Sequence, residues 1–188
     1  MSQRAFRYFT IVAGGTPQPL VGTKLTAAVS PAPATGSQPA GSPDTPVSLP
    51  VADSSMFLNG DRVILDIPSS GVEENVKVFS VPDATHIKVS GIQFVHSSGI
   101  YVRLAVLINS VYVQALDGNA GALYIGTAAT MVKATGVSVL AKTQLVASGV
   151  QPTEFSSTRS GLANADDLGN LWIDGTTGDS YLPSIGQL

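Results

Sequence analysis

Apolar and polar residues alternate over several short stretches in the middle of the chain. The stretches are residues 61–67 (DRVILDI), 75–81 (NVKVFSV), 86–89 (HIKV) and 99–104 (GIYVRL), all rich in valine and isoleucine. Turn-forming residues precede or separate them, as at Asn59-Gly60 and Pro82-Asp83. Alternation with a period of two is typical of strands, and this region has no spacing of an amphipathic helix. The pattern predicts a small antiparallel β-barrel or β-sandwich.

The last third of the chain shows the same pattern of short strands separated by turns. Strands are expected at residues 107–116, 122–125, 137–140 and 171–173, the last followed by the turn dipeptide Asp174-Gly175. Residues 122–127 (ALYIGT) and 170–176 (NLWIDGT) resemble each other, since both place Leu, an aromatic residue and Ile before a glycine turn. A chance likeness between two edge strands is the favoured interpretation, and a duplicated hairpin is the alternative.

Proline is concentrated near the N-terminus. Eight of the twelve prolines lie between residues 17 and 50, and residues 30–50 consist almost wholly of Pro, Ala, Gly, Ser and Thr. Proline fixes φ and removes a backbone donor, so this segment favours extended structure and disfavours a central strand. It is expected to be a flexible linker or an extended arm that lies over a neighbouring subunit.

The fold predicted from these patterns is all-β. It has an extended N-terminal arm with the Pro-rich segment, followed by two small antiparallel β barrel or sandwich modules. The expected boundaries are residues 1–50 for the N-terminal strand, arm and linker, 51–105 for the small barrel, and 106–188 for the C-terminal β-domain.

The small number of charged residues argues against some classes of function. Charged residues make up 12% of the 188 residues and the net charge is −3, against about 25% charged residues in an average soluble protein. A nucleic-acid-binding domain needs a basic face, which this composition does not favour. No apolar run is long enough for a transmembrane helix, and the first residues lack the pattern of a secretory signal. Nucleic acid and membrane are therefore not expected as partners, and a surface covered by neighbouring subunits is one explanation of the low charge.

The sequence contains no arrangement of residues that is typical of a catalytic, metal-binding or cofactor-binding site. Cysteine is absent, which excludes disulfides, thiolate metal sites and a cysteine nucleophile. His86 and His96 have no metal-ligand spacing and are interpreted as a strand histidine and a turn histidine. Adjacent acids in turns are usually solvated. Residues 174–179 lack the ligand pattern of a calcium loop and are interpreted as a hairpin turn. The glycines near the N-terminus lack a phosphate-binding ending. The adjacent acids are Glu73-Glu74 and Asp166-Asp167, and the glycines are Gly14-Gly15. We expect no catalytic residue, metal or cofactor.

A group of aromatic and basic residues stands near the N-terminus. It consists of Arg4, Phe6, Arg7 and Tyr8. Aromatic residues and arginine are enriched among the residues that anchor protein interfaces. These four are the candidate subunit contacts, and packing of a first strand in the core is the equally weighted alternative.

Three stretches make the chain resemble a virion structural protein of tailed bacteriophages. They are RYFTIVAGGTPQPL near the N-terminus, the segment from SLPVADSSMFLNGDRVILD to GIYVRL, and the end from ALYIGTAATMVKATGVSVLA to LGNLWIDGTTGDSYLPSIG. The middle segment is similar to a small barrel of phage head and tail proteins, with Phe57, Gly60-Asp61, Val63, His96 and Gly99 as its marks. The stretches cover most of the chain, and each is a pattern of strands and turns without a catalytic signature.

Among such proteins, the chain is most similar to capsid cement (decoration) proteins. This resemblance implies a non-enzymatic protein, made in the host cytoplasm, that binds the major capsid protein at the virion surface and associates with itself as a homotrimer. It also implies an N-terminal arm over the capsid, while the two-module layout is larger than the smallest cement proteins. A tail, collar or head-to-tail adaptor is the alternative, as is a receptor- or carbohydrate-binding module in which Tyr124, Trp172 and Tyr181 stack on sugar rings.

Overall fold

The computed structural model describes residues 2–33, 36–37, 40–42, 44–116, 118–127, 129–130, 137–139, 154–155 and 167–187. The regular elements of these residues are short strands and two single-turn 3₁₀ helices, Pro68–Ser70 and Leu168–Asn170. The predicted all-β class is confirmed. Within the described residues, no helix has the length and apolar character needed to cross a membrane.

The chain forms two compact units, which divide it differently from the expected modules. Unit 1 combines Met1–Leu20 with Leu107–Leu188, and unit 2 is Val21–Val106. The expected boundary near residue 105 coincides with the end of unit 2. Residues 1–50, in contrast, are not one arm, because their first part belongs to unit 1 and the rest supplies strands of unit 2.

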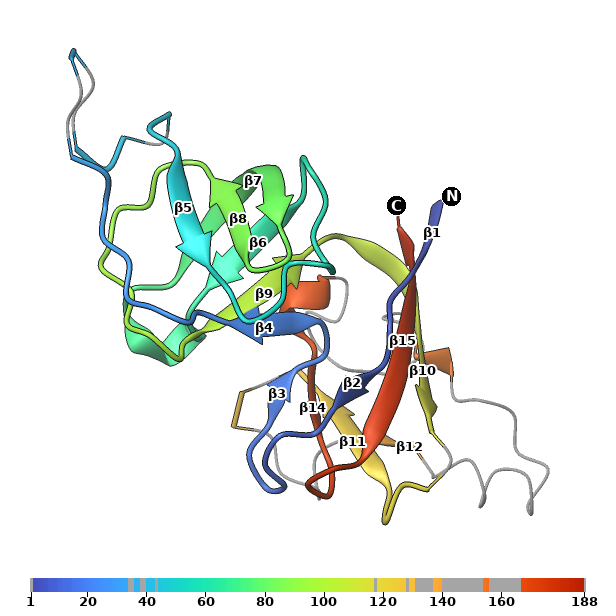
Figure 1. Ribbon diagram of the computed structural model, residues 1–188. Coiled ribbons are helices and arrows are strands. Elements are labelled where there is room, and N and C mark those ends of the chain that lie inside the picture. Colours follow the sequence, from blue (N-terminus) through green and yellow to red (C-terminus); the bar gives the residue numbers. More distant parts are fainter. Residues whose placement is uncertain are drawn as a thin grey trace. The chain divides into compact units, whose positions relative to one another are not determined.

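Unit 2 is a curled antiparallel sheet of six strands in the order β4-β9-β6-β7-β8-β5 (Figure 1). The edge strands β4 and β5 meet at one end through the antiparallel bridge between Leu25 and Val51. The strands are β4 (Gly22–Lys24), β5 (Val47–Pro50), β6 (Arg62–Leu65), β7 (Glu74–Asp83), β8 (His86–Val89) and β9 (Tyr101–Ala105).

Alternating side chains fill the inside of this curled sheet, because successive residues of a strand point to opposite faces. The inward positions are valine, leucine and isoleucine, each at most 4% exposed: Leu49, Val63, Leu65, Val76, Val78, Ile87, Val89, Val102 and Leu104. Burying one such side chain contributes about 1.5–3 kcal/mol. The alternation that predicted these strands is therefore the same feature that builds the core.

Unit 1 contains two antiparallel sheets. The first has the order β1-β15-β10-β13, with β2 also pairing with β15. The second has the order β12-β11-β14-β3. The strands are β1 (Ser2–Ala5), β2 (Phe9–Thr10), β3 (Gln18–Pro19), β10 (Ile108–Ala115), β11 (Leu123–Gly126), β12 (Val137–Val139), β13 (Glu154–Phe155), β14 (Trp172–Asp174) and β15 (Ser180–Gln187).

The two ends of the chain meet in unit 1. Strand β1 pairs along β15, with Ser2 opposite Gln187 and Ala5 opposite Ser184, and Figure 1 shows the termini side by side. Tyr181 links the two sheets: its ring stacks on Phe9 at 5.6 Å, and its hydroxyl donates to the carbonyl of Leu20 at 3.2 Å. The N-terminal residues are therefore built into the core of unit 1.

The strands predicted from alternation are confirmed, most closely at residues 86–89, which form β8. Strand β15 was not predicted, and for residues 1–50 one N-terminal strand was expected where the structure has β1 to β5. The two similar stretches, 122–127 and 170–176, supply β11 and β14, which pair with each other and are both interior strands. Their interpretation as edge strands is therefore wrong.

The described parts of the Pro-rich segment pack onto unit 2. The amide of Gly41 donates to the carbonyl of Ala32, and Val47–Pro50 forms the edge strand β5. Gly91 fits closely against this segment, because a Cβ at Gly91 would lie 1.7 Å from the carbonyl oxygen of Ser42 and 2.9 Å from that of Thr45. Proline at the end of an edge strand removes no central ladder bond, which explains why β5 tolerates Pro50.

The contact at Gly91 predicts a large effect of a single methyl group. We expect Gly91→Ala to lower the free energy of unfolding by about 3 kcal/mol, because backbone atoms must shift to admit the Cβ. Gly99→Ala is the control: Gly99 has a φ of +88° but no atom near the added Cβ, and should cost about 1 kcal/mol. Urea unfolding measures both, and equal losses in the two variants would contradict the close packing at Gly91.

Candidate functional site

The four candidate contact residues occupy different environments in unit 1. Phe6 is buried in the core, and the Arg4 guanidinium lies 5.2 Å from the centre of its ring. Arg7 is exposed, and Tyr8 is 64% exposed. Only Arg7 and Tyr8 thus present most of their surface to a partner, while Phe6 has the core role that was the alternative.

The aromatic residues expected to stack on sugars are mostly inaccessible. Trp172 is 1% exposed and Tyr181 is fully buried, while Tyr124 is partly exposed. A sugar ring cannot reach the faces of the first two without unfolding unit 1. The expected stacking role of Trp172 and Tyr181 is therefore wrong.

The acidic turn at residues 174–179 is a structural turn. Asp174 Oδ1 accepts the amides of Gly15 and Gly175 at 2.9 and 2.7 Å, and Asp179 Oδ1 accepts the amide of Ala120 at 2.7 Å. Both carboxylates are 3% exposed. The turn connects β14 and β15, which lie in different sheets, so it is not the expected hairpin. Of the pair Asp166-Asp167, the side chain of Asp167 accepts the amide of Gly169, and Asp166 lies outside the described residues.

Five ionisable side chains of unit 2 lie close together: Asp66, Glu73, Glu74, His96 and Arg103, which we call the ionic cluster. His96 was expected in a turn, but its side chain is fully buried and Nε2 lies 3.0 Å from Glu74 Oε1. Glu74 was expected to be solvated, but its two oxygens also accept the amides of Gln93 and Phe94 at 2.7 and 2.8 Å.

Arg103 completes the ionic cluster. Its side chain is fully buried, forms an ion pair with Glu73, and donates from Nε to the carbonyl of Asp66 at 3.1 Å. Asp66 has a φ of 72°, a conformation that is uncommon outside glycine. The guanidinium therefore holds a strained turn at the end of β6 and joins it to the segment before β7.

The geometry of His96 indicates a structural role. Its Nδ1 has no hydrogen-bond partner among the described residues and lies 3.8 Å from Asp66 Oδ2, beyond hydrogen-bond distance. With no exposed surface, this imidazole cannot exchange a proton with a bound substrate. In the described part of the chain, no group of three or more His, Asp or Glu side chains is placed to hold a metal ion.

The sequence analysis missed the ionic cluster, although one signal in the sequence could have indicated it. Arg103 lies within the apolar stretch 99–104, between Val102 and Leu104, and both neighbours are buried. An arginine in a strand that is buried on both faces needs a buried carboxylate or carbonyl partner. The pattern does not say which partner, and His96 gave no comparable signal.

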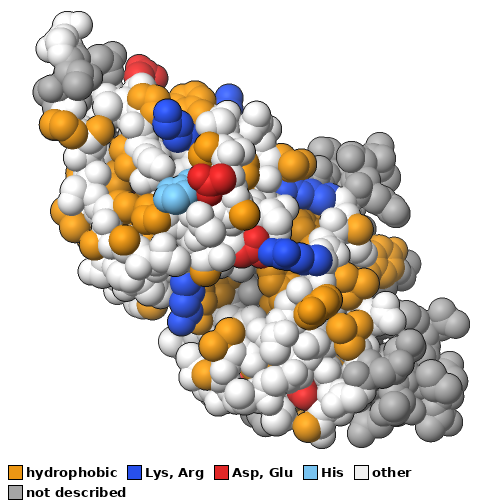
Figure 2. Space-filling model, in the orientation of Figure 1, with side chains coloured by type: hydrophobic (Ala, Val, Ile, Leu, Met, Phe, Trp, Pro, Cys, Tyr) orange, Lys and Arg blue, Asp and Glu red, His pale blue; other side chains and the backbone are white. Residues whose placement is uncertain are grey.

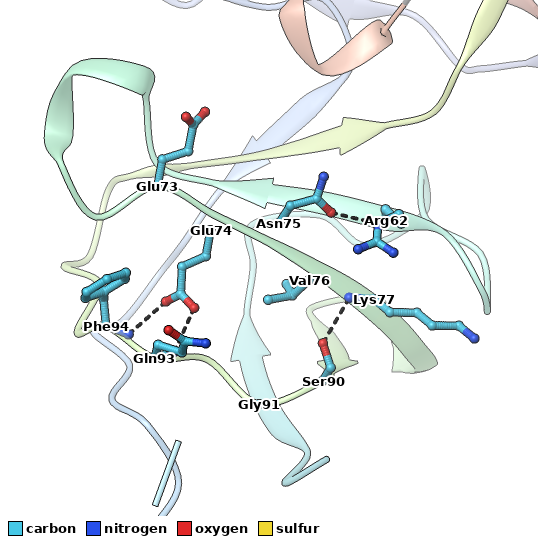
Figure 3. A pocket seen from close by; sticks show the side chains of 10 residues that line it. All are labelled: Arg62, Glu73, Glu74, Asn75, Val76, Lys77, Ser90, Gly91, Gln93 and Phe94. Atoms are coloured by element: carbon cyan, nitrogen blue, oxygen red, sulfur yellow. Dashed lines mark hydrogen bonds between the residues drawn. The ribbon is translucent and has the colours of Figure 1, made fainter. Parts of the chain in front are cut away.

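A polar groove borders the ionic cluster (Figure 3). It has a volume of about 350 Å³ and lies between the first half of β7 and the segment that follows β8. In Figure 3 the side chain of Lys77 extends away from the other groove residues, and Arg62 Nε donates to Asn75 Oδ1 at 2.9 Å. The lining residues are Arg62, Glu73, Glu74, Asn75, Val76, Lys77, Ser90, Gly91, Gln93 and Phe94.

We expect Glu74→Ala to destabilise unit 2 by about 3 kcal/mol, because it leaves the buried His96 and two amides without their acceptor. Hydrogen exchange by NMR should show faster exchange at the amides of Gln93 and Phe94. Asp44→Ala is the control, since it removes an exposed carboxylate of unit 2 that is not part of the ionic cluster. Unchanged exchange at both positions in Glu74→Ala would contradict this account of the ionic cluster.

The turn between β7 and β8 gives a pH-dependent prediction. The Thr85 amide, with a smaller contribution from the His86 side chain, lowers the pKa of Asp83 from 3.8 to about 2. A carboxylate with a lower pKa in the folded state stabilises the fold above its unfolded pKa, and this stabilisation is lost as the pH falls through the folded value. The stability difference between the native protein and Asp83→Asn should therefore shrink between about pH 4 and pH 2. A constant difference across this range would contradict the assignment.

The chain was also compared with known proteins. No model of a protein family, no curated protein and no solved structure matches it.

Proposed function

We propose that the protein is a non-enzymatic virion structural protein that binds and stabilises a bacteriophage capsid as a cement (decoration) protein. The assignment to a virion comes from the resemblance of its sequence. The observation that supports an assembly role is an uncharged outer sheet face in unit 1, formed by β1, β15 and β10, which we call the outer face.

Strand register places the residues of the outer face. Ala5, Ser184 and Tyr112 form one row across the three strands, and Leu182 lies beside Gln114 in a second row. These five positions are exposed or partly exposed, whereas the intervening residues of β15 and β10 with described side chains are buried. These five positions of β1, β15 and β10 are uncharged; the first row continues onto β13, where Glu154 stands opposite Tyr112 at the edge of the sheet.

Exposed apolar residues elsewhere in unit 1 support the same role. Val12 is 70% exposed, Tyr8 is 64% exposed and Leu107 is 58% exposed. Figure 2 shows that apolar and uncharged groups dominate the visible described surface, with acidic and basic groups scattered among them. An uncharged face loses little hydration energy when a neighbour covers it, which favours protein–protein contact.

A cement protein acts through many copies. A stable contact buries about 800 Å² on each partner, and a shell repeats each contact many times. Small free energies per copy then sum to resist the pressure of packaged DNA. The proposal includes the major capsid protein as partner, a position on the capsid surface and self-association as a homotrimer.

The second candidate place is the tail, the collar or the head-to-tail junction. The same outer face suits any repeated protein contact. These candidate functions therefore differ in where the protein lies on the phage particle. Electron microscopy of particles carrying a labelled copy of the protein distinguishes the capsid surface from the tail.

The test of the cement proposal uses phage particles with and without the protein. Particles that lack it should lose DNA at a lower temperature than complete particles, as measured by nuclease sensitivity after heating. Adding back purified protein should restore resistance. Equal heat resistance of the two kinds of particle would overturn the cement role.

A charged substitution connects the outer face to this activity. Ser184→Arg, on β15 in the middle of the outer face, should lower occupancy on particles at least tenfold, because an unpaired charge becomes buried in the contact. Ser97→Arg is the control, since Ser97 is exposed in unit 2. Thermal unfolding should confirm that both variants fold, and equal occupancy of the two would exclude the outer face as the contact.

A further inference from the structure

The outer side of the curled sheet in unit 2 carries a group of basic side chains around an aromatic ring. It consists of Arg62 on β6, Lys77 and Phe79 on β7, and Lys88 on β8, and we call it the basic face. The three basic side chains are exposed, and Phe79 is 47% exposed. Arg62 and Lys77 are direct cross-strand neighbours, and Lys88 pairs with Ser80, next to Phe79.

Two like charges at directly opposed positions destabilise an antiparallel pair. The Arg62–Lys77 pair has no compensating carboxylate among the described residues: Arg62 bonds to the neutral Asn75, and no side-chain partner of Lys77 or Lys88 is found there. In a chain with only ten basic residues, such a pairing works against folding.

The carboxylates nearby in the sequence are engaged in other bonds. Glu73 pairs with Arg103, and Glu74 with His96 and two amides. The remaining four between residues 51 and 106 accept backbone amides in turns: Asp53 from Ser55, Asp61 from Leu58, Asp66 from Ile67 and Asp83 from Thr85. None of these six carboxylates forms a described ion pair with Arg62, Lys77 or Lys88, although residues 51–106 carry six acids against four bases.

We propose that the basic face, together with the groove beside it, binds an acidic extended segment of a partner protein. A carboxylate between Arg62 and Lys77 turns their repulsion into two attractions. Both residues also line the polar groove, and Phe94 lies in the same lining, so an aromatic surface is available to the bound chain.

The backbone beside the groove favours a polypeptide. Lys77 exchanges hydrogen bonds with Ser90, since its amide donates to the Ser90 hydroxyl and its carbonyl accepts the Ser90 amide. In an antiparallel ladder, alternate residues direct their main-chain groups to the same side, so those of Asn75 also point away from β6. After Ser90 the chain leaves β7 through Gly91, and an extended peptide can pair with Asn75 there.

A nucleic acid fits this surface less well. Three cations release few counterions, and the net charge of −3 opposes a polyanion. The inference deepens the proposed function and rests on it for the existence of a protein partner in the virion. The surface itself is defined by the charges and register of unit 2 alone.

The test measures binding of a fluorescent peptide of alternating Glu and Ser residues to the full-length protein at low ionic strength. The matched Gln-Ser peptide and an oligothymidylate of similar length are the comparison probes. We expect the Glu-Ser peptide to bind, the Gln-Ser peptide not to bind, and added salt to weaken binding because the charges are exposed. Stronger binding of the oligothymidylate, or equal binding of the two peptides, would overturn the proposal.

Variants locate the binding surface. Lys77→Gln and Lys88→Gln should each weaken peptide binding about three- to tenfold. Lys24→Gln is the matched control, because it removes the same charge from an exposed position on β4, where Lys24 contacts Tyr101. Lys24→Gln should keep native affinity, and a loss equal to that of Lys77→Gln would show a response to net charge and overturn the assignment.

Lys77→Glu separates stability from binding. Opposite Arg62 it creates an attractive cross-strand pair, so the unfolding temperature should rise while peptide binding is lost. A fall in both would mean that Lys77 supports the fold, which overturns the proposal. Sedimentation at low ionic strength tests whether a second copy of the chain occupies the basic face. Self-association that Lys77→Gln abolishes would assign the basic face to that second copy and overturn the proposal of an acidic partner.

The peptide-binding test and the cement test can succeed or fail independently of each other. If the acidic peptide fails to bind while particles without the protein lose DNA on heating, the basic face is excluded and the cement role remains. If peptide binding is found but heat resistance is unchanged, the binding surface remains and the cement role is excluded.

Discussion

The carboxylate of Glu74 is the constraint on which unit 2 depends. A buried carboxylate must be fully bonded, and this one accepts two amides and the His96 imidazole. These bonds fix the segment after β8, and through Gly91 they fix the place where the Pro-rich segment returns. The returning segment becomes β5, and its end bridges to β4. One acid at the start of β7 thus determines how the curled sheet closes.

Local alternation was enough to predict the central strands of unit 2 and most strands of the C-terminal part. It failed for β1 and β2, because these strands are two to four residues long and pair with β15, far away in the sequence. No local pattern encodes a partner at that separation. The same distance explains why residues 1–50 were assigned to an N-terminal strand, arm and linker, with core packing of the first aromatic residues as the alternative.

The ionic cluster was not predicted; the signal for it that the sequence does contain is Arg103, whose apolar neighbours require a buried partner. Glu73 and Glu74 were expected in a solvated turn, but β7 begins at Glu74 and only Glu73 precedes it. The pairing of Glu74 with His96 depends on how the segment after β8 folds back, which no spacing rule describes. The burial of Trp172 and Tyr181 was also missed. Both lie on inward strand positions, and no spacing rule shows which face of these strands packs inward.

The positions of the charged residues explain more about the low charge of the chain than their number does. Between residues 51 and 106 the acids accept backbone amides in turns or bond to the buried Arg103 and His96, whereas Arg62, Lys77 and Lys88 face outward. In unit 1 the outer face is uncharged at its five positions on β1, β15 and β10, and Glu154 on β13 lies at its edge. An uncharged face suits repeated contacts between like proteins, and a small uncompensated basic face selects an acidic partner. Affinity and selectivity can therefore reside on separate units of one chain.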